Sequence, residues 1–213
     1  MTPEREQRIR QVAAKRQMDL AVVIENVHDV HNIAAVVRTC DAVGINRVYA
    51  LYTDPQIKTT KLKIGKRTSA GARKWVDVHM FKDMDACMNE VCANHEQVFA
   101  TALGDETRSI YQCDFLQSTA LVFGNEHGGV SDELLKYCTG RIIIPQAGMV
   151  QSLNISVACA VTLYEVLRQR EAAGFYTDNP TQAGEIKQSL LEDWFERHES
   201  GSKGKAMKRR GDF

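Results

Sequence analysis

The chain has 213 residues, of which 44% are hydrophobic and 25% are charged, a composition that excludes a disordered chain and favours one large domain with attached arms. No apolar run approaches the roughly 20 residues of a membrane-spanning helix, and the N-terminus lacks the apolar core of a secretory signal, so we expect a soluble cytoplasmic protein with no membrane partner. The net charge of zero argues by itself against a nucleic-acid binder.

The predicted elements begin with a basic amphipathic helix over residues 2–17. Alternating short apolar runs and helical patterns then predict an α/β domain with a mainly parallel sheet. Its expected strands are 20–27, 47–52, 97–103, 119–125 and 141–145. Its expected helices lie in the runs 33–44 and 83–95, in a segment capped by Ser131, and in the run 152–174, where Gly174 is expected as the C′ residue.

A second short helix is expected over residues 185–197, followed by a basic tail with no apolar face, which we expect to be disordered. The resulting division is a basic N-terminal arm (1–18), a central domain (19–174), a C-terminal helical arm (175–199) and a tail (200–213).

Basic residues are clustered although the chain is neutral. They gather in residues 5–16, 58–74 and 203–210, and such clusters can bind phosphates through counterion release. Solvated helix faces explain the same charges equally well.

The six cysteines form no CxxC pair, which predicts reduced, buried thiols. Cys87, Cys92 and His95 lack a fourth ligand at a suitable spacing, so we expect no metal.

The first unusual segment places Asn32 near a helix start and Arg38 inside an otherwise apolar helix. Residues six apart point about 120° away from each other, so the two side chains do not automatically share a face. An arginine in an apolar helix indicates a bound anion, although an ion pair with Asp41 or Glu25 remains an alternative.

Two further segments follow predicted strands. FGNEHGG (123–129) joins a strand to a capped helix, where glycines allow close backbone approach to a ligand and Glu126 faces the same crevice, although a plain turn remains an alternative. In IPQAGMVQSLNISVA (144–158), Ser152 and Asn154 open the long helix; capping alone would explain either residue, and the free N–H groups could hold an anion.

Together and in this order, the three segments resemble the motifs of the SpoU/TrmH branch of the SPOUT 2′-O-methyltransferases across roughly residues 20–170. The resemblance implies a SPOUT-type α/β knot with a C-terminal trefoil knot, a homodimer and S-adenosylmethionine as methyl donor. It implies catalytic roles for Arg38, Asn32, Glu126, Ser152 and Asn154. The implied cofactor-binding residues are Thr101, Leu103, Gly104, Gly124, Ile144, Met149 and Leu153.

The resemblance further implies that tRNA phosphates are contacted by Arg8, Arg16, His31, Arg168 and Arg170, with solvent-facing charge as the alternative. Family accounts make the arginine at position 38 a base, which is awkward because guanidinium resists deprotonation, so our hypothesis is a bidentate phosphate clamp. The short arms favour guanosine 18 of the tRNA D-loop as target. Ribosomal RNA, the tRNA wobble nucleotide, a non-catalytic knotted RNA-binding protein and a nucleotide-binding regulator are the alternatives.

Overall fold

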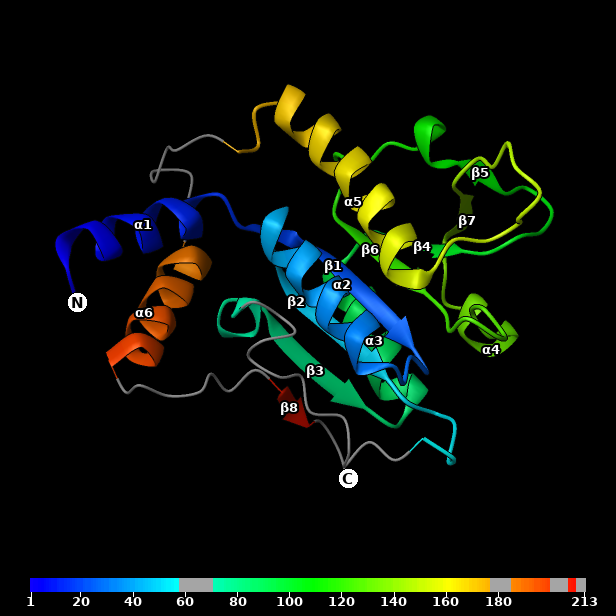
Figure 1. Ribbon diagram of the computed structural model, residues 1–213, viewed down its shortest axis with the longest axis horizontal. Coiled ribbons are helices and arrows are strands. Elements are labelled where there is room, and N and C mark those ends of the chain that lie inside the picture. Colours follow the sequence, from blue (N-terminus) through cyan, green and yellow to red (C-terminus); the bar gives the residue numbers. More distant parts are fainter. Residues whose placement is uncertain (58–70, 177–184, 200–206, 210–213) are drawn as a thin grey trace.

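The computed structural model describes residues 1–57, 71–176, 185–199 and 207–209. Its centre is an eight-stranded sheet of order β5-β7-β4-β6-β1-β2-β3-β8, in which every neighbouring pair is parallel, so the predicted α/β class is confirmed (Figure 1). The strands are β1 (Gln17–Glu25), β2 (Ile45–Leu51), β3 (Asp77–Phe81), β4 (Gln97–Thr101), β5 (Arg108–Ser109), β6 (Thr119–Phe123), β7 (Gly140–Ile143) and β8 (Met207–Arg209).

The five predicted strands are present, and three others were not predicted. β3 contains Asp77 and His79, which hide its apolar pattern, and β5 has only two residues. β8 pairs with β3 inside the basic tail, so the expectation of disorder is wrong for these three residues. The other tail residues, and positions 58–70 of the central basic cluster, lie outside the described residues.

The helices are α1 (Pro3–Ala14), α2 (Val30–Ala42), α3 (Met84–Asn94), α4 (Asp132–Leu135), α5 (Ile155–Ala172) and α6 (Glu185–Glu199). The Ser131 hydroxyl accepts from the Leu134 N–H, and Gly174 has a left-handed φ of 81° after α5, as predicted. The long helix does not open at Ser152, however: Asn154 is its N-cap and accepts from the Ser156 N–H.

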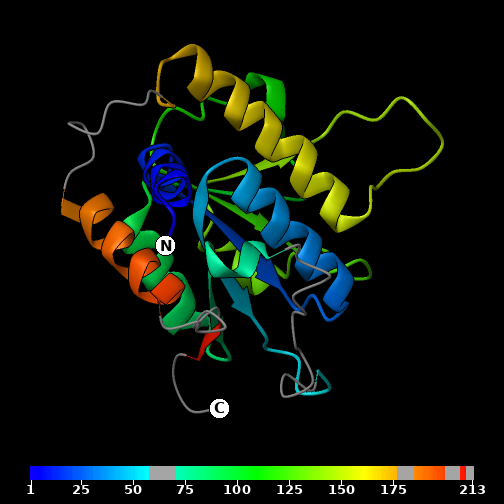
Figure 2. The ribbon, with the colours of Figure 1, turned by 60° about the vertical axis from the view of Figure 1, so that its left-hand side comes forward.

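Two apolar layers cover the sheet. α2 and α5 lie side by side over one face, where Val36, Val37 and Leu163 pack against the strands (Figures 1 and 2). α3 and α4 cover the other face through residues such as Met88 and Leu134. None of the helices in the described part of the chain is long and apolar enough to cross a membrane.

The two helical arms form a third, smaller core beside the sheet. α1 and α6 pack together through Ile9, Ala13, Leu190, Leu191 and Trp194. Figure 1 shows this pair at the end of the molecule opposite α4. The arms, far apart in sequence, therefore form one unit against the central domain.

Candidate functional site

A cleft of about 1160 Å³ opens at the carboxyl ends of β4, β6 and β7, where parallel sheets usually bind ligands. The loops after these three strands line it. Eight of the residues predicted for the site lie in this lining: Thr101, Leu103, Gly124, Glu126, Ile144, Ser152, Leu153 and Asn154. Gly104 and Met149 are not part of it, and Met149 is fully exposed on the β7–α5 loop, which projects from the body in Figure 2.

The loop after β6 folds tightly on itself. A Cβ at Gly124 would lie 1.8 Å from the carbonyl carbon of Gly129, so only glycine fits there. The Asn125 side chain accepts from the N–H groups of His127 (2.9 Å) and Gly128 (2.7 Å). Asn125, which the sequence analysis did not single out, thus shapes the loop through an asparagine turn.

Three of the predicted catalytic residues meet at the mouth of this cleft. The Asn32 side-chain N–H donates to the Glu126 carboxylate, and the Asn154 side-chain N–H donates to Oδ1 of Asn32 over 3.2 Å. Because these residues come from α2, the β6–α4 loop and the start of α5, the network joins the three motifs. Ser152 lines the cleft beside it.

Arg38 lies apart from this network, on the exposed side of α2. Its side chain makes no hydrogen bond or ion pair with any residue of the described ranges. The ion pairs considered as alternatives are not formed, because Asp41 pairs with Arg16 and Glu25 binds Ser131. Its guanidinium is therefore free of any carboxylate in the part of the chain that the structure describes.

A second contact, which was not predicted from the sequence, joins the end of the loop after β6 to β1. The buried Glu25 carboxylate at the end of β1 accepts from the Ser131 N–H over 2.8 Å and from the Ser131 hydroxyl over 2.5 Å. Ser131 also caps α4, so one serine joins β1, the cleft loop and the helix that follows. A serine cap is visible in sequence, whereas its distant acidic partner is not.

The predicted tRNA-contacting residues divide into two groups. Arg8, His31 and Arg168 are exposed, and Arg168 also forms a bidentate pair with Glu165 at 2.8 Å. Arg16 and Arg170 are completely buried.

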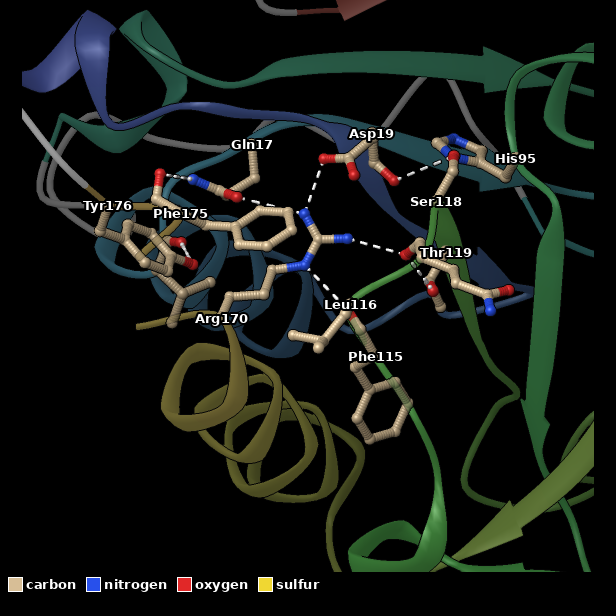
Figure 3. Close-up of polar contacts among 12 residues, drawn as sticks. Gln17, Asp19, His95, Phe115, Leu116, Ser118, Thr119, Arg170, Phe175 and Tyr176 are labelled. Atoms are coloured by element: carbon tan, nitrogen blue, oxygen red, sulfur yellow. Dashed lines mark hydrogen bonds and ion pairs between the residues drawn. The ribbon is translucent and has the colours of Figure 1, made fainter. Parts of the chain in front are cut away.

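Arg170 is paired with Asp19 at 2.7 Å (Figure 3). Arg16 is paired with Asp41. Assigning these two arginines to RNA phosphates is therefore wrong for this structure, because neither offers any surface to a phosphate.

The charge of the cleft is acidic. Its lining contains Glu126 and Asp132 but neither lysine nor arginine. No cluster of three metal-ligating side chains occurs within the described residues. Burial raises the pKa of Cys87 and Cys138 to about 12, so these thiols stay protonated and are poor nucleophiles or metal ligands.

Comparison with known proteins matches residues 19–164 to the model of the SpoU rRNA Methylase family. The tRNA (guanosine(18)-2′-O)-methyltransferase of Thermus thermophilus is 42% identical over 193 residues, which cover 91% of this chain and 96% of the relative. The crystal structure of the Aquifex aeolicus TrmH/SpoU tRNA modifying enzyme aligns with a TM-score of 0.81 at 38% identity, covering 94% of this chain and 98% of that one.

A further solved structure is the SpoU methyltransferase AviRb from Streptomyces viridochromogenes in complex with AdoMet. It is 26% identical with a TM-score of 0.62, covering 73% of this chain and 62% of that one. The family match spans more than half of the chain, and the Thermus relative matches nearly all of it. The chain belongs to the SpoU methylase family.

Proposed function

We propose that the protein transfers a methyl group from S-adenosylmethionine to the 2′-hydroxyl of guanosine 18 in tRNA. The main support is that Asn32, Glu126 and Asn154 are joined by hydrogen bonds beside a cleft at the carboxyl ends of the strands. The tRNA target is supported by the Thermus tRNA (guanosine(18)-2′-O)-methyltransferase, whose similarity covers 91% of this chain.

The cleft suits the proposed cofactor. Its floor is apolar, with Phe123 and Ile142 buried beneath it, and polar backbone and side-chain groups surround the rim. Such a combination suits a ligand with an aromatic base and a polar tail. The tight loop at Gly124 lets its backbone groups approach such a ligand closely. The predicted residues of this lining, with Gly104 and Met149 beside it, would hold the cofactor, which supplies an electrophilic sulfonium methyl group.

The chain's contribution to the reaction is chiefly alignment. The ribose oxygen must approach the methyl carbon opposite the breaking carbon–sulfur bond, and holding the two in line can contribute about 7–11 kcal/mol. Asn32 and Asn154 would fix the acceptor nucleotide at the mouth of the cleft. Glu126 accepts from Asn32 and so sets which way its amide faces.

Arg38 would clamp a phosphate next to the acceptor ribose. Its guanidinium is exposed and not neutralised by a carboxylate of the described residues, as a phosphate ligand requires. A guanidinium that keeps its proton cannot be the base, so we assign Arg38 to orientation of the hydroxyl. The exposed Arg8, His31 and Arg168 would contact tRNA phosphates that lie farther from the acceptor nucleotide.

We further propose that the protein is a homodimer, that its chain forms a trefoil knot and that it acts in the cytoplasm. α5 exposes Val157 and Tyr164, seven residues apart on one helical face, at 46% and 54%, and this apolar stripe would be buried in a homodimer. The segment between β7 and α5 would form the trefoil knot of the family, and the protein would act in the cytoplasm. Light scattering of the full chain tests the dimer directly, since a Tyr164→Lys variant should then be monomeric.

Labelled methyl transfer tests the proposed activity. The full chain is incubated with methyl-labelled S-adenosylmethionine and either total tRNA or ribosomal RNA, and labelled nucleotides are identified after digestion. We expect 2′-O-methylguanosine from tRNA alone. Label in ribosomal RNA or at the wobble nucleotide would favour those alternatives, and no label in any RNA would favour a non-catalytic RNA-binding protein.

A further inference from the structure

Arg170 joins three separate segments of the chain. Its Nε donates to the Phe115 carbonyl (2.9 Å), Nη2 to the Gln117 carbonyl (2.8 Å), and Nη1 to the side chains of Gln17 (3.1 Å) and Asp19 (2.7 Å). Figure 3 shows the guanidinium at the centre of these contacts. All three nitrogens are engaged, so the end of α5 is tied to the start of β1 and to the segment that leads into β6.

Arg16 makes a similar junction between the arms and the core. It lies between α1 and β1, donates to the Ile45 carbonyl over 2.9 Å and is ion-paired with Asp41 at the end of α2. Its guanidinium also lies over the ring of Trp194 from α6, 5.0 Å from the centroid. One buried side chain of the N-terminal arm thus contacts both the C-terminal arm and the central domain.

A phosphate could reach either guanidinium only after these contacts were broken. Both side chains have no exposed surface, and each carries an acidic partner that already balances its charge. Removing one partner from a buried ion pair leaves an uncompensated charge, which is strongly destabilising. Arg168, two residues before Arg170, also pairs with an acidic residue, Glu165, but its side chain is 67% exposed, so a phosphate can reach it from solvent.

We propose that Arg16 and Arg170 are positioning residues that fix the α1–α6 unit and the end of α5 against the core. They thereby set the spacing between exposed arginines such as Arg8 and Arg168, through which tRNA would be bound. The assignment rests on the proposed tRNA function. It predicts that losing Arg170 harms tRNA binding without removing a phosphate contact.

The salt dependence of tRNA binding separates the two roles, because each lost phosphate contact reduces the slope of log K against log salt by about one. We compare Arg170→Gln with the matched control Arg168→Gln. Arg170→Gln should weaken tRNA binding several-fold at every salt concentration with an unchanged slope, and lower Tm by about 6–20 °C. Arg168→Gln should reduce the slope by about one and leave Tm within about 2 °C. A reduced slope with an unchanged Tm in Arg170→Gln would overturn the assignment.

Asp19→Asn provides a second test should Arg170→Gln fail to fold. If Arg170 bound a tRNA phosphate, removing the neighbouring anion would leave tRNA binding unchanged or tighter. Such a result would overturn our proposal. A positioning role predicts weaker tRNA binding, an unchanged salt slope and a lower Tm.

The cofactor cleft lies at the opposite ends of the strands from Asp19, so S-adenosylmethionine affinity should stay within about twofold in all three variants. A wild-type chain that binds S-adenosylmethionine but no tRNA would instead contradict the proposed function, and this assignment with it.

Discussion

Replacing Ser131 with alanine tests how the cleft loop is held. The hydroxyl caps α4 through the Leu134 N–H, and loss of such a cap costs about 1 kcal/mol. It also donates to the buried Glu25 carboxylate over 2.5 Å, and a hydrogen bond to a charged group contributes about 1.5–3 kcal/mol. The Ser131 backbone N–H still binds Glu25 in the variant. We therefore expect Ser131→Ala to lower the free energy of unfolding by about 2.5–4 kcal/mol.

For a protein of this size, that loss corresponds to a decrease in Tm of about 5–16 °C, measurable by calorimetry. Ser131→Thr, which keeps the hydroxyl, is the matched control and should lose less than about 1 kcal/mol. S-adenosylmethionine affinity, measured by titration below the Tm of the variant, should fall as well, because Ser131 directly follows the cleft loop. A loss below about 1 kcal/mol in the alanine variant would refute the reasoning, since the cap alone accounts for that amount.

Three other substitutions test separate parts of the structure. Arg38→Lys should reduce kcat at every accessible pH, because lysine cannot clamp a phosphate bidentately, and near-normal kcat would rule the clamp out. Burial lowers the pKa of His95, so as the pH falls below about 6.5 the unfolded chain takes up a proton that the folded protein excludes, and the free energy of unfolding decreases. His95→Asn should therefore weaken the pH dependence of that free energy, measured by urea unfolding between pH 7.5 and about 5. An unchanged pH dependence would contradict this. Trp194→Ala should cost about 3–5 kcal/mol and expose the C-terminal arm to protease, whereas wild-type protease resistance would show that the arm does not depend on this ring.

The core strands could be predicted because their apolar runs depend on local sequence alone. β3 could not, since two of its residues are polar and lie close to charged side chains of other elements. Asp77 pairs with Arg197 of α6 at 2.8 Å, and His79 lies 3.5 Å from Glu90 of α3. The partner of Asp77 lies 120 positions away, so nothing in a local window marks this polar residue as part of a buried strand.

The same limit explains the error over Arg16 and Arg170. Charged residues are rarely buried, so a basic arm predicts a solvent-facing surface. Burial here depends on Asp19 and Asp41, and nothing in the sequence marks these two acids as partners. A family motif transfers residue identity but does not show whether each side chain is exposed.

Three residues from the three sequence motifs lie together in the structure. Asn32, Glu126 and Asn154 were expected together from three motifs in order, and they share one hydrogen-bonded network. The helix start at Asn154 rather than Ser152 was not foreseen, because either residue is a good cap and tertiary contact with Asn32 favours the second. The roles of all these residues in catalysis stay predictions.

Methylation of a single tRNA at a single nucleotide tests the central claim most directly. The full chain is mixed with methyl-labelled S-adenosylmethionine and either an unmodified tRNA or the same tRNA carrying 2′-deoxyguanosine at nucleotide 18. We predict one methyl group per unmodified tRNA and none on the deoxy tRNA, which lacks the acceptor oxygen. Equal labelling of both tRNAs would contradict the account.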